Sequence, residues 1–60
     1  MSKNEQAIYI MKIIDSCIDP VQLLACNSLI MNFHLIHEDL SIRDLLLEIM
    51  NNRKVIIDEL

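Results

Sequence analysis

Glycine is absent from the 60 residues of this chain, and Pro20 is the only proline. Glycine supplies the left-handed backbone conformations that tight hairpin turns require, so little in the sequence could close such turns. Long helices joined by short connections are the arrangement that this composition favours.

Aromatic and basic residues are also scarce. The chain has one Tyr, one Phe and no Trp, its formal net charge is −4, and its pI is about 4.8. Nucleic-acid binders need clustered cations to displace counterions, and single-strand binders add rows of aromatic rings. We therefore expect no nucleic-acid partner. The five basic residues are scattered along the sequence: Lys3, Lys12, Arg43, Arg53 and Lys54.

Long apolar runs are missing as well. No run approaches the roughly 18 to 20 residues that span a bilayer. Residues 1–6, MSKNEQ, lack the apolar segment of a signal peptide. We expect no membrane partner and a cytoplasmic location, in which Cys17 and Cys26 would be reduced thiols.

Aliphatic residues are what the chain has in abundance. Apolar residues make up 53% of the sequence, and the mean hydropathy is +0.36. Residues 1–60 form at most one domain, and a chain this short buries only about 60% of the surface that its unfolded form exposes. Some apolar side chains must therefore stay exposed or face a partner.

The spacing of these residues predicts an all-α fold, a three-helix antiparallel bundle with helices over about residues 3–17, 20–37 and 42–58 and a turn at 37–40. In the first helix, apolar residues recur at steps of three and four, while Lys12, Asp15 and Ser16 fall on the other side. The apolar positions are Ala7, Ile10, Met11, Ile14, Cys17 and Ile18.

The start of the second helix has a clear signature. Asp19 is predicted as the N-cap, with Pro20 at the first helical position and Gln22 at the third, which resembles a capping box. Ile18 and Leu23 are spaced as a hydrophobic staple around this cap. Replacing Asp19 by Ala is expected to cost about 1 kcal/mol.

The third helix shows a similar pattern. Ser41 is predicted as its N-cap, with Asp44 at the third helical position. Leu40 and Leu45 are spaced as its staple. Replacing Ser41 by Ala is likewise expected to cost about 1 kcal/mol.

One face of the third helix is predicted to be buried, and Arg53 falls in its middle. We expect the Arg53 stem to pack against the core with the charged head at the rim, the alternative being a buried ion pair. The predicted buried residues are Ile42, Leu45, Leu46, Ile49, Ile56, Ile57 and Leu60.

The second helix carries two apolar stripes on nearly opposite sides. One three-helix monomer covers one stripe but hardly both, so the second stripe predicts another surface, most simply that of a second copy in a homodimer. The predicted core stripe is Leu23, Cys26, Leu29, Ile30, Phe33 and His37. The predicted protein interface is Val21, Leu24, Ser28, Met31 and Leu35.

Cys17 and Cys26 are the first candidate site. In an antiparallel helix pair that turns near residue 19, the two residues are offset by roughly 10 Å of helical rise, beyond the reach of a disulfide. Both occupy core-facing positions, where a thiol behaves as a small hydrophobe. We expect them to be reduced and inert.

His34 and His37 are the second candidate site. Their spacing, with Glu38 one residue further, could present a metal to one helix face, and a dimer could supply more ligands. Two histidines near a helix C-terminus, where they favour the helix dipole, are the simpler reading. We expect no metal and no cofactor.

Catalytic patterns are missing. The sequence has no nucleophile with a base beside it and no glycine-rich phosphate loop. We therefore expect that this protein is not an enzyme.

The segment SCIDPVQL at residues 16–23, followed by Asn27, Ile30 and Phe33, resembles small uncharacterised helical proteins of Bacteroidetes genomes, phages and conjugative elements. Those proteins often show a Ser-Cys, a polar cap, Gln-Leu and then Asn-x-x-Ile-x-x-Phe. Pro20 departs from the acidic residue usual at that position. The resemblance covers most of the chain and implies a helical fold and a mobile-element origin, but transfers no activity.

These features predict a small non-enzymatic protein–protein interaction module, such as a phage or mobile-element regulator or inhibitor. Its expected partner is a second copy, or another helical protein. The alternative is a compact dimeric nucleic-acid-associated accessory protein, which would need the basic face that the sequence lacks.

Overall fold

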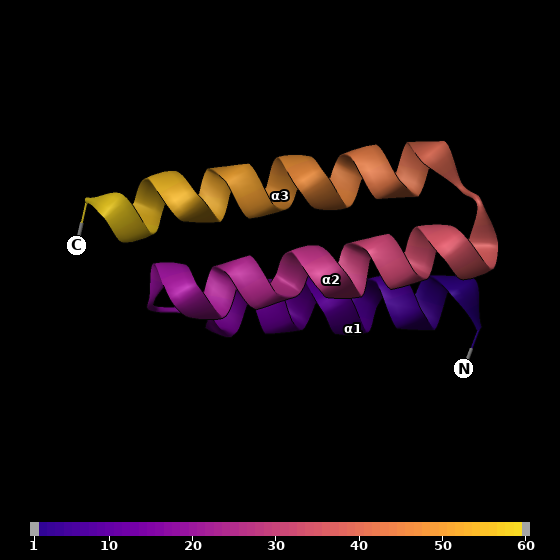
Figure 1. Cartoon of the computed structure of the whole chain (residues 1–60), viewed down its shortest axis with the longest axis horizontal. Helices are drawn as coiled ribbons and strands as arrows, with labels where there is room; N and C mark the ends of the chain where they lie inside the picture. Colours follow the sequence, from indigo (N-terminus) through magenta and orange to yellow (C-terminus); the bar gives the residue numbers. More distant parts are fainter. Residues whose placement is uncertain (1, 60) are drawn as a thin grey trace.

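A computed structural model of the chain describes residues 2–59 and shows three α-helices (Figure 1). They are α1 (Lys3–Ser16), α2 (Pro20–His37) and α3 (Leu40–Asp58). The predicted all-α three-helix bundle is confirmed, with α2 at its predicted bounds and α3 starting two residues earlier than predicted.

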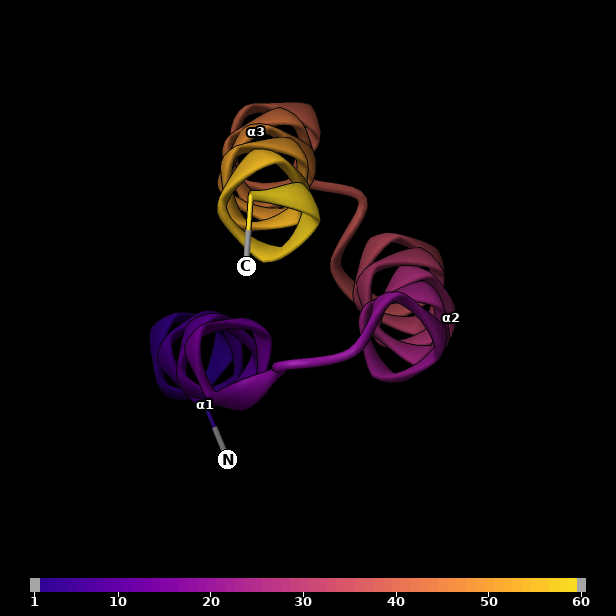
Figure 2. The same cartoon turned by 90° about the vertical axis from the view of Figure 1, so that its left-hand side faces the viewer.

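The helices run up, down and up, so that α1 and α3 point the same way and α2 runs against both (Figure 1). Seen along the bundle, they stand at the corners of a triangle (Figure 2). Every pair of helices is in contact. The axes of the molecule measure 33, 18 and 15 Å.

The core lies along the centre of this triangle and is aliphatic apart from Phe33 and two cysteines. Phe33, Ile14, Ile30 and Leu46 have no exposed surface. Met11, Leu29, Ile42 and Ile49 are partly buried against it, at positions predicted for the core. The buried residues are Ala7, Ile10, Ile14, Cys17, Leu23, Cys26, Ile30, Phe33, Leu46 and Ile57.

Three residues predicted for the core are exposed instead. Ile18 is 68% exposed, Leu45 49% and Ile56 47%. Ile18 lies beyond the end of α1, in the extended connection. Leu45 and Ile56 each precede a buried residue of α3 by one position, which turns them about 100° away from the core. The predicted core residue Leu60 lies outside the described residues.

The predicted cap of α2 is confirmed. The Asp19 carboxylate accepts a hydrogen bond from the Val21 amide at 2.7 Å, and Pro20 starts the helix. The Gln22 side chain reaches back as a capping box would, but its Oε1 accepts from the amide of Ile18 at 3.1 Å, one residue before the cap.

The predicted cap of α3 is wrong. Asp39, not Ser41, is the N-cap, and its Oδ1 accepts from the Ile42 amide at 3.0 Å. Leu40 is therefore the first helical residue, and Ser41 lies inside the first turn. Asp39 also pairs with Lys3 of α1 at 2.8 Å, a partner that a sequence pattern cannot reveal. Aspartate caps as well as serine does, so the ion pair favours the earlier start.

Candidate functional site

The most distinctive surface of the molecule is the side of α2 that faces away from the core. We call Val21, Leu24, Ser28, Met31 and Leu35 the α2 outer surface. All five are exposed, and the four apolar side chains keep between 46% and 75% of their surface in solvent. The monomer therefore leaves the predicted interface residues uncovered.

This surface belongs to a helix without formal charge. From Pro20 to His37 the chain has no Asp, Glu, Lys or Arg. Both α1 and α3 carry acidic and basic residues, as surface helices usually do. Two acidic positions, Asp19 and Glu38, flank α2 at its ends.

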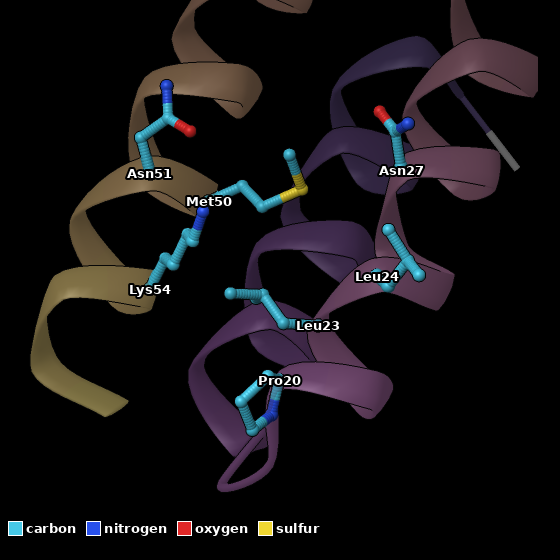
Figure 3. Close-up of a pocket in the computed structure, with 7 residues that line it drawn as sticks. All are labelled: Pro20, Leu23, Leu24, Asn27, Met50, Asn51 and Lys54. Carbon is cyan, nitrogen blue, oxygen red and sulfur yellow. The ribbon is translucent and has the colours of Figure 1, made fainter. Parts of the chain in front are cut away.

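A shallow pocket adjoins the α2 outer surface on the side of α3 (Figure 3). Its volume is about 190 Å³. Figure 3 shows the Met50 side chain reaching from α3 toward α2, with Pro20 at one end of the pocket and the amides of Asn27 and Asn51 at the other. Leu23, Leu24 and Lys54 complete the lining.

Leu24 belongs both to the pocket and to the α2 outer surface, so the two form one continuous apolar area. The sequence did not indicate the pocket. Met50, Asn51 and Lys54 were assigned no role there, because the rotation of α3 relative to α2 depends on packing that a single helix pattern does not specify.

The two cysteines lie much closer together than predicted. Their sulfur atoms are 3.6 Å apart, and both residues are buried as free thiols. The predicted offset of roughly 10 Å assumed that α1 continues through Cys17. The helix instead ends at Ser16, and Cys17 has extended backbone that directs its side chain inward, toward Cys26.

Hydrogen bonds hold both thiols in place. The Cys17 Sγ donates to the Ile13 carbonyl at 3.2 Å, and the Cys26 Sγ donates to the Gln22 carbonyl at 3.7 Å. Burial, and next the hydrogen bond with Cys17, raise the pKa of Cys26 to about 11. Cys26 is therefore protonated at neutral pH, which suits the predicted inert thiol.

Arg53 is half-buried and reaches across to the end of α1. Its Nε and Nη2 atoms donate to the Cys17 carbonyl at 2.9 and 2.7 Å. Cys17 is the C-cap of α1, so the guanidinium satisfies a carbonyl at a helix end. The charged group thus binds a backbone oxygen. Neither of the two alternatives for Arg53, a head at the rim or a buried ion pair, included this contact.

The predicted histidine pair is only partly available to a ligand. The His37 Nε2 lies 2.8 Å from the Gln6 Oε1, and its ring packs on Phe33 with centroids 4.8 Å apart. Across residues 2–59, no group of three or more His, Cys, Asp or Glu side chains could hold a metal ion.

Three of the five basic side chains are engaged within the molecule. Lys3 pairs with Asp39, Arg43 pairs with Asp44 at 2.9 Å, and Arg53 binds the Cys17 carbonyl.

Comparison with protein-family models, with curated proteins and with solved structures gave no match for this chain. None of the described helices combines the length and the apolar character needed to cross a membrane. The α2 outer surface is therefore the feature from which a function is proposed.

Proposed function

We propose that this protein is a non-enzymatic interaction module, that it acts through the α2 outer surface, and that a second copy of the chain covers this surface in a homodimer. One observation carries the proposal. An 18-residue helix without formal charge exposes four large apolar side chains on one side.

The energetics favour covering this surface. Fully burying a side chain such as Leu24, Met31 or Leu35 gains roughly 1.5 to 3 kcal/mol. A charged helix face would offset that gain through desolvation, but α2 has no charges to desolvate. A small fold with a thin stability margin has much to gain from such a contact.

The spacing of the surface suits a two-fold axis. Ser28 stands at its centre, so in an antiparallel pair of α2 helices Ser28 would meet Ser28 of the second copy. Val21 would then meet Leu35 of the other copy, and Leu24 would lie within about 1.5 Å of Met31 along the helix axis. The small Ser28 side chain allows close approach of the helices, and one patch serves both subunits.

The predicted contact is modest in size. From Val21 to Leu35 the surface is roughly 21 Å long. The pocket beside Leu24 extends it toward α3 and could take an apolar side chain of the second copy. A helix pair of this length falls at the low end of stable interfaces, so we expect micromolar affinity.

This surface also suits the role predicted from the sequence. A phage or mobile-element regulator or inhibitor needs only a surface that occupies another protein. Another helical protein with an apolar face could then replace the second copy on the same residues. Catalysis and nucleic-acid binding have no supporting geometry on this surface.

Sedimentation equilibrium over the micromolar range tests the proposal. We expect the wild type to approach the dimer mass, and Met31→Glu and Leu24→Glu to remain monomeric because each places a charge in the contact. Val55→Glu is the matched control. Val55 is 57% exposed on the side of α3 opposite its buried residues, so this variant should dimerise like the wild type.

Salt dependence adds a second readout. In the antiparallel pair, Asp19 of one copy approaches Glu38 of the other, so added salt should screen this repulsion and tighten the dimer slightly. A wild type that stays monomeric at high micromolar concentration would refute the homodimer and leave a different helical protein as the occupant.

A further inference from the structure

The Cys17–Cys26 pair has no part in the proposed function. The two thiols contact each other inside the core; Cys17 directly follows the end of α1, and Cys26 lies in the second turn of α2. Cys17 is 4% exposed and Cys26 is 1% exposed. A metal would need further ligands that the described residues do not bring here. Oxidation of the pair needs no further protein side chain, only an external oxidant.

We propose that Cys17 and Cys26 are a modification site, at which a small-molecule disulfide such as oxidised glutathione converts the two thiols into a reversible intramolecular disulfide.

The geometry favours this bond. The sulfur atoms are 3.6 Å apart and must approach to about 2.05 Å, a movement of roughly 1.5 Å. Cys17 lies outside both helices, and its side chain can rotate toward Cys26 while its backbone keeps the bonds from its amide to the Ile14 carbonyl and from Arg53 to its own carbonyl. The thiols would give up their bonds to the Ile13 and Gln22 carbonyls, which belong to intact helices.

The reaction takes two exchange steps. Cys17 lies next to the exposed residue Ile18, so opening of the connection uncovers Cys17 before Cys26. The Cys17 thiolate attacks one sulfur of the external disulfide and releases one thiolate. The Cys26 thiolate then attacks the Cys17 sulfur of the mixed disulfide and releases the second.

The products balance. The protein loses two thiol protons and two electrons, and the external disulfide becomes two thiols. High burial and the raised pKa of Cys26 make the reaction slow in the folded state, so the pair responds to sustained oxidation and not to brief exposure.

The disulfide would close a short ring across the connection between α1 and α2. Such a ring restricts the unfolded chain, so the oxidised protein should melt about 10 °C above the reduced protein. The bridge would hold the second turn of α2 against the end of α1 and leave the α2 outer surface unchanged.

Mass spectrometry after equilibration in mixtures of reduced and oxidised glutathione tests this proposal. The reaction is stopped with acid, and remaining thiols are alkylated. We expect folded wild type to become a monomer lighter by two hydrogen atoms, with no alkylated thiol. Cys17→Ala and Cys26→Ala should yield only mixed disulfides with glutathione or unreacted thiol. Circular dichroism verifies that each sample is helical.

Three results would overturn the proposal. The first is that wild type accumulates only glutathione adducts or intermolecular disulfides. The second is that the bridge forms only under denaturing conditions. The third is that the bridged protein melts below the reduced protein, which would mean that the bond does not fit the native core. Because the bridge leaves the α2 outer surface unchanged, dimerisation affects the reduced and the bridged protein alike, and the outcome is independent of the proposed function.

Discussion

At the scale of single residues, Glu38 occupies a backbone conformation that usually belongs to glycine, which this chain lacks. It ends α2 with a φ of 50°, in the left-handed region, and it is the only such residue between positions 2 and 59. This conformation crowds a side chain against its own backbone and usually belongs to glycine. The carboxylate also lies at the negative end of the α2 dipole.

Replacing Glu38 by Gly should therefore stabilise the protein by about 0.5 to 1 kcal/mol, the relief of backbone crowding exceeding the added flexibility of the unfolded chain. Urea denaturation measures the change. Glu38→Gln removes the charge but keeps the crowding, so it should recover less of this gain. Equal stabilities of the two variants would mean that charge, not backbone conformation, limits the wild type.

Cys26 gives a second residue-scale prediction. Burial raises its pKa from 9.0 to about 11 in the folded protein, so the unfolded chain loses this proton first as the pH rises. The stability that the protonated thiol contributes is therefore complete below pH 9 and is lost as the pH rises toward 11.

Thermal melts of the reduced protein at a series of alkaline pH values measure this loss. Comparison with Cys26→Ala isolates the contribution of this thiol. The gap in melting temperature between the two proteins should narrow as the pH rises. A constant gap would contradict the assignment.

At the scale of helices, the beginnings of α2 and α3 are fixed by aspartate caps. Asp19→Ala should cost about 1 kcal/mol. Asp39→Ala should also lower the melting temperature, because the amide of Ile42 and Lys3 both lose their acceptor. Ser41→Ala is the matched control and should melt like the wild type, since Ser41 is not the cap.

The Asp39 cap should also respond to acid. The hydrogen bond from Lys3, and next that from the Ile42 amide, lower the pKa of Asp39 below 3.8. Its contribution to stability is present above pH 3.8 and is lost as the pH falls through the lowered value. Melts of the wild type and Asp39→Ala should therefore converge in strong acid.

Helix existence and the two-sided character of α2 could be predicted because both depend on local spacing. The buried residues of α2 at Leu23, Cys26, Ile30 and Phe33, and the exposed ones on its other side, follow directly from its period. The N-cap of α3 could not, since Ser41 and Asp39 are both competent caps and the ion pair with Lys3 decides between them.

The cysteine contact and the pocket could not be predicted from the sequence. A single residue of extended backbone at Cys17 brought the thiols together, and a helical pattern does not indicate where a helix stops within one residue. The pocket beside Leu24 depends on how α3 is rotated against α2, which involves residues of both helices at once.

At the scale of the whole molecule, the bundle has one core and exposes large apolar side chains on all three helices, more of them on α2 than on α1 or α3. On α2, five large apolar side chains are exposed: the four of the α2 outer surface and Ile36. The charges lie elsewhere, on α1, on α3 and at both ends of α2. The exposed apolar side chains of α1 and α3 therefore lie on helices that also carry charges, whereas those of the α2 outer surface lie on an uncharged helix.

Two polar contacts between α1 and α3 have the same sequence separation. Lys3 binds Asp39 at one end of the bundle, and the Cys17 carbonyl binds Arg53 at the other, and each pair is 36 residues apart. Two parallel helices with the same rise per residue keep such a separation constant along their length. The two contacts therefore fix together the axial register of α3 against α1. If α3 slipped by one turn, Lys3 would face Arg43, a like charge, and the Cys17 carbonyl would face Ile57, which has no side-chain donor. Aliphatic side chains alone would define the axial register of α3 against α1 only weakly, and the two polar contacts disfavour this slip.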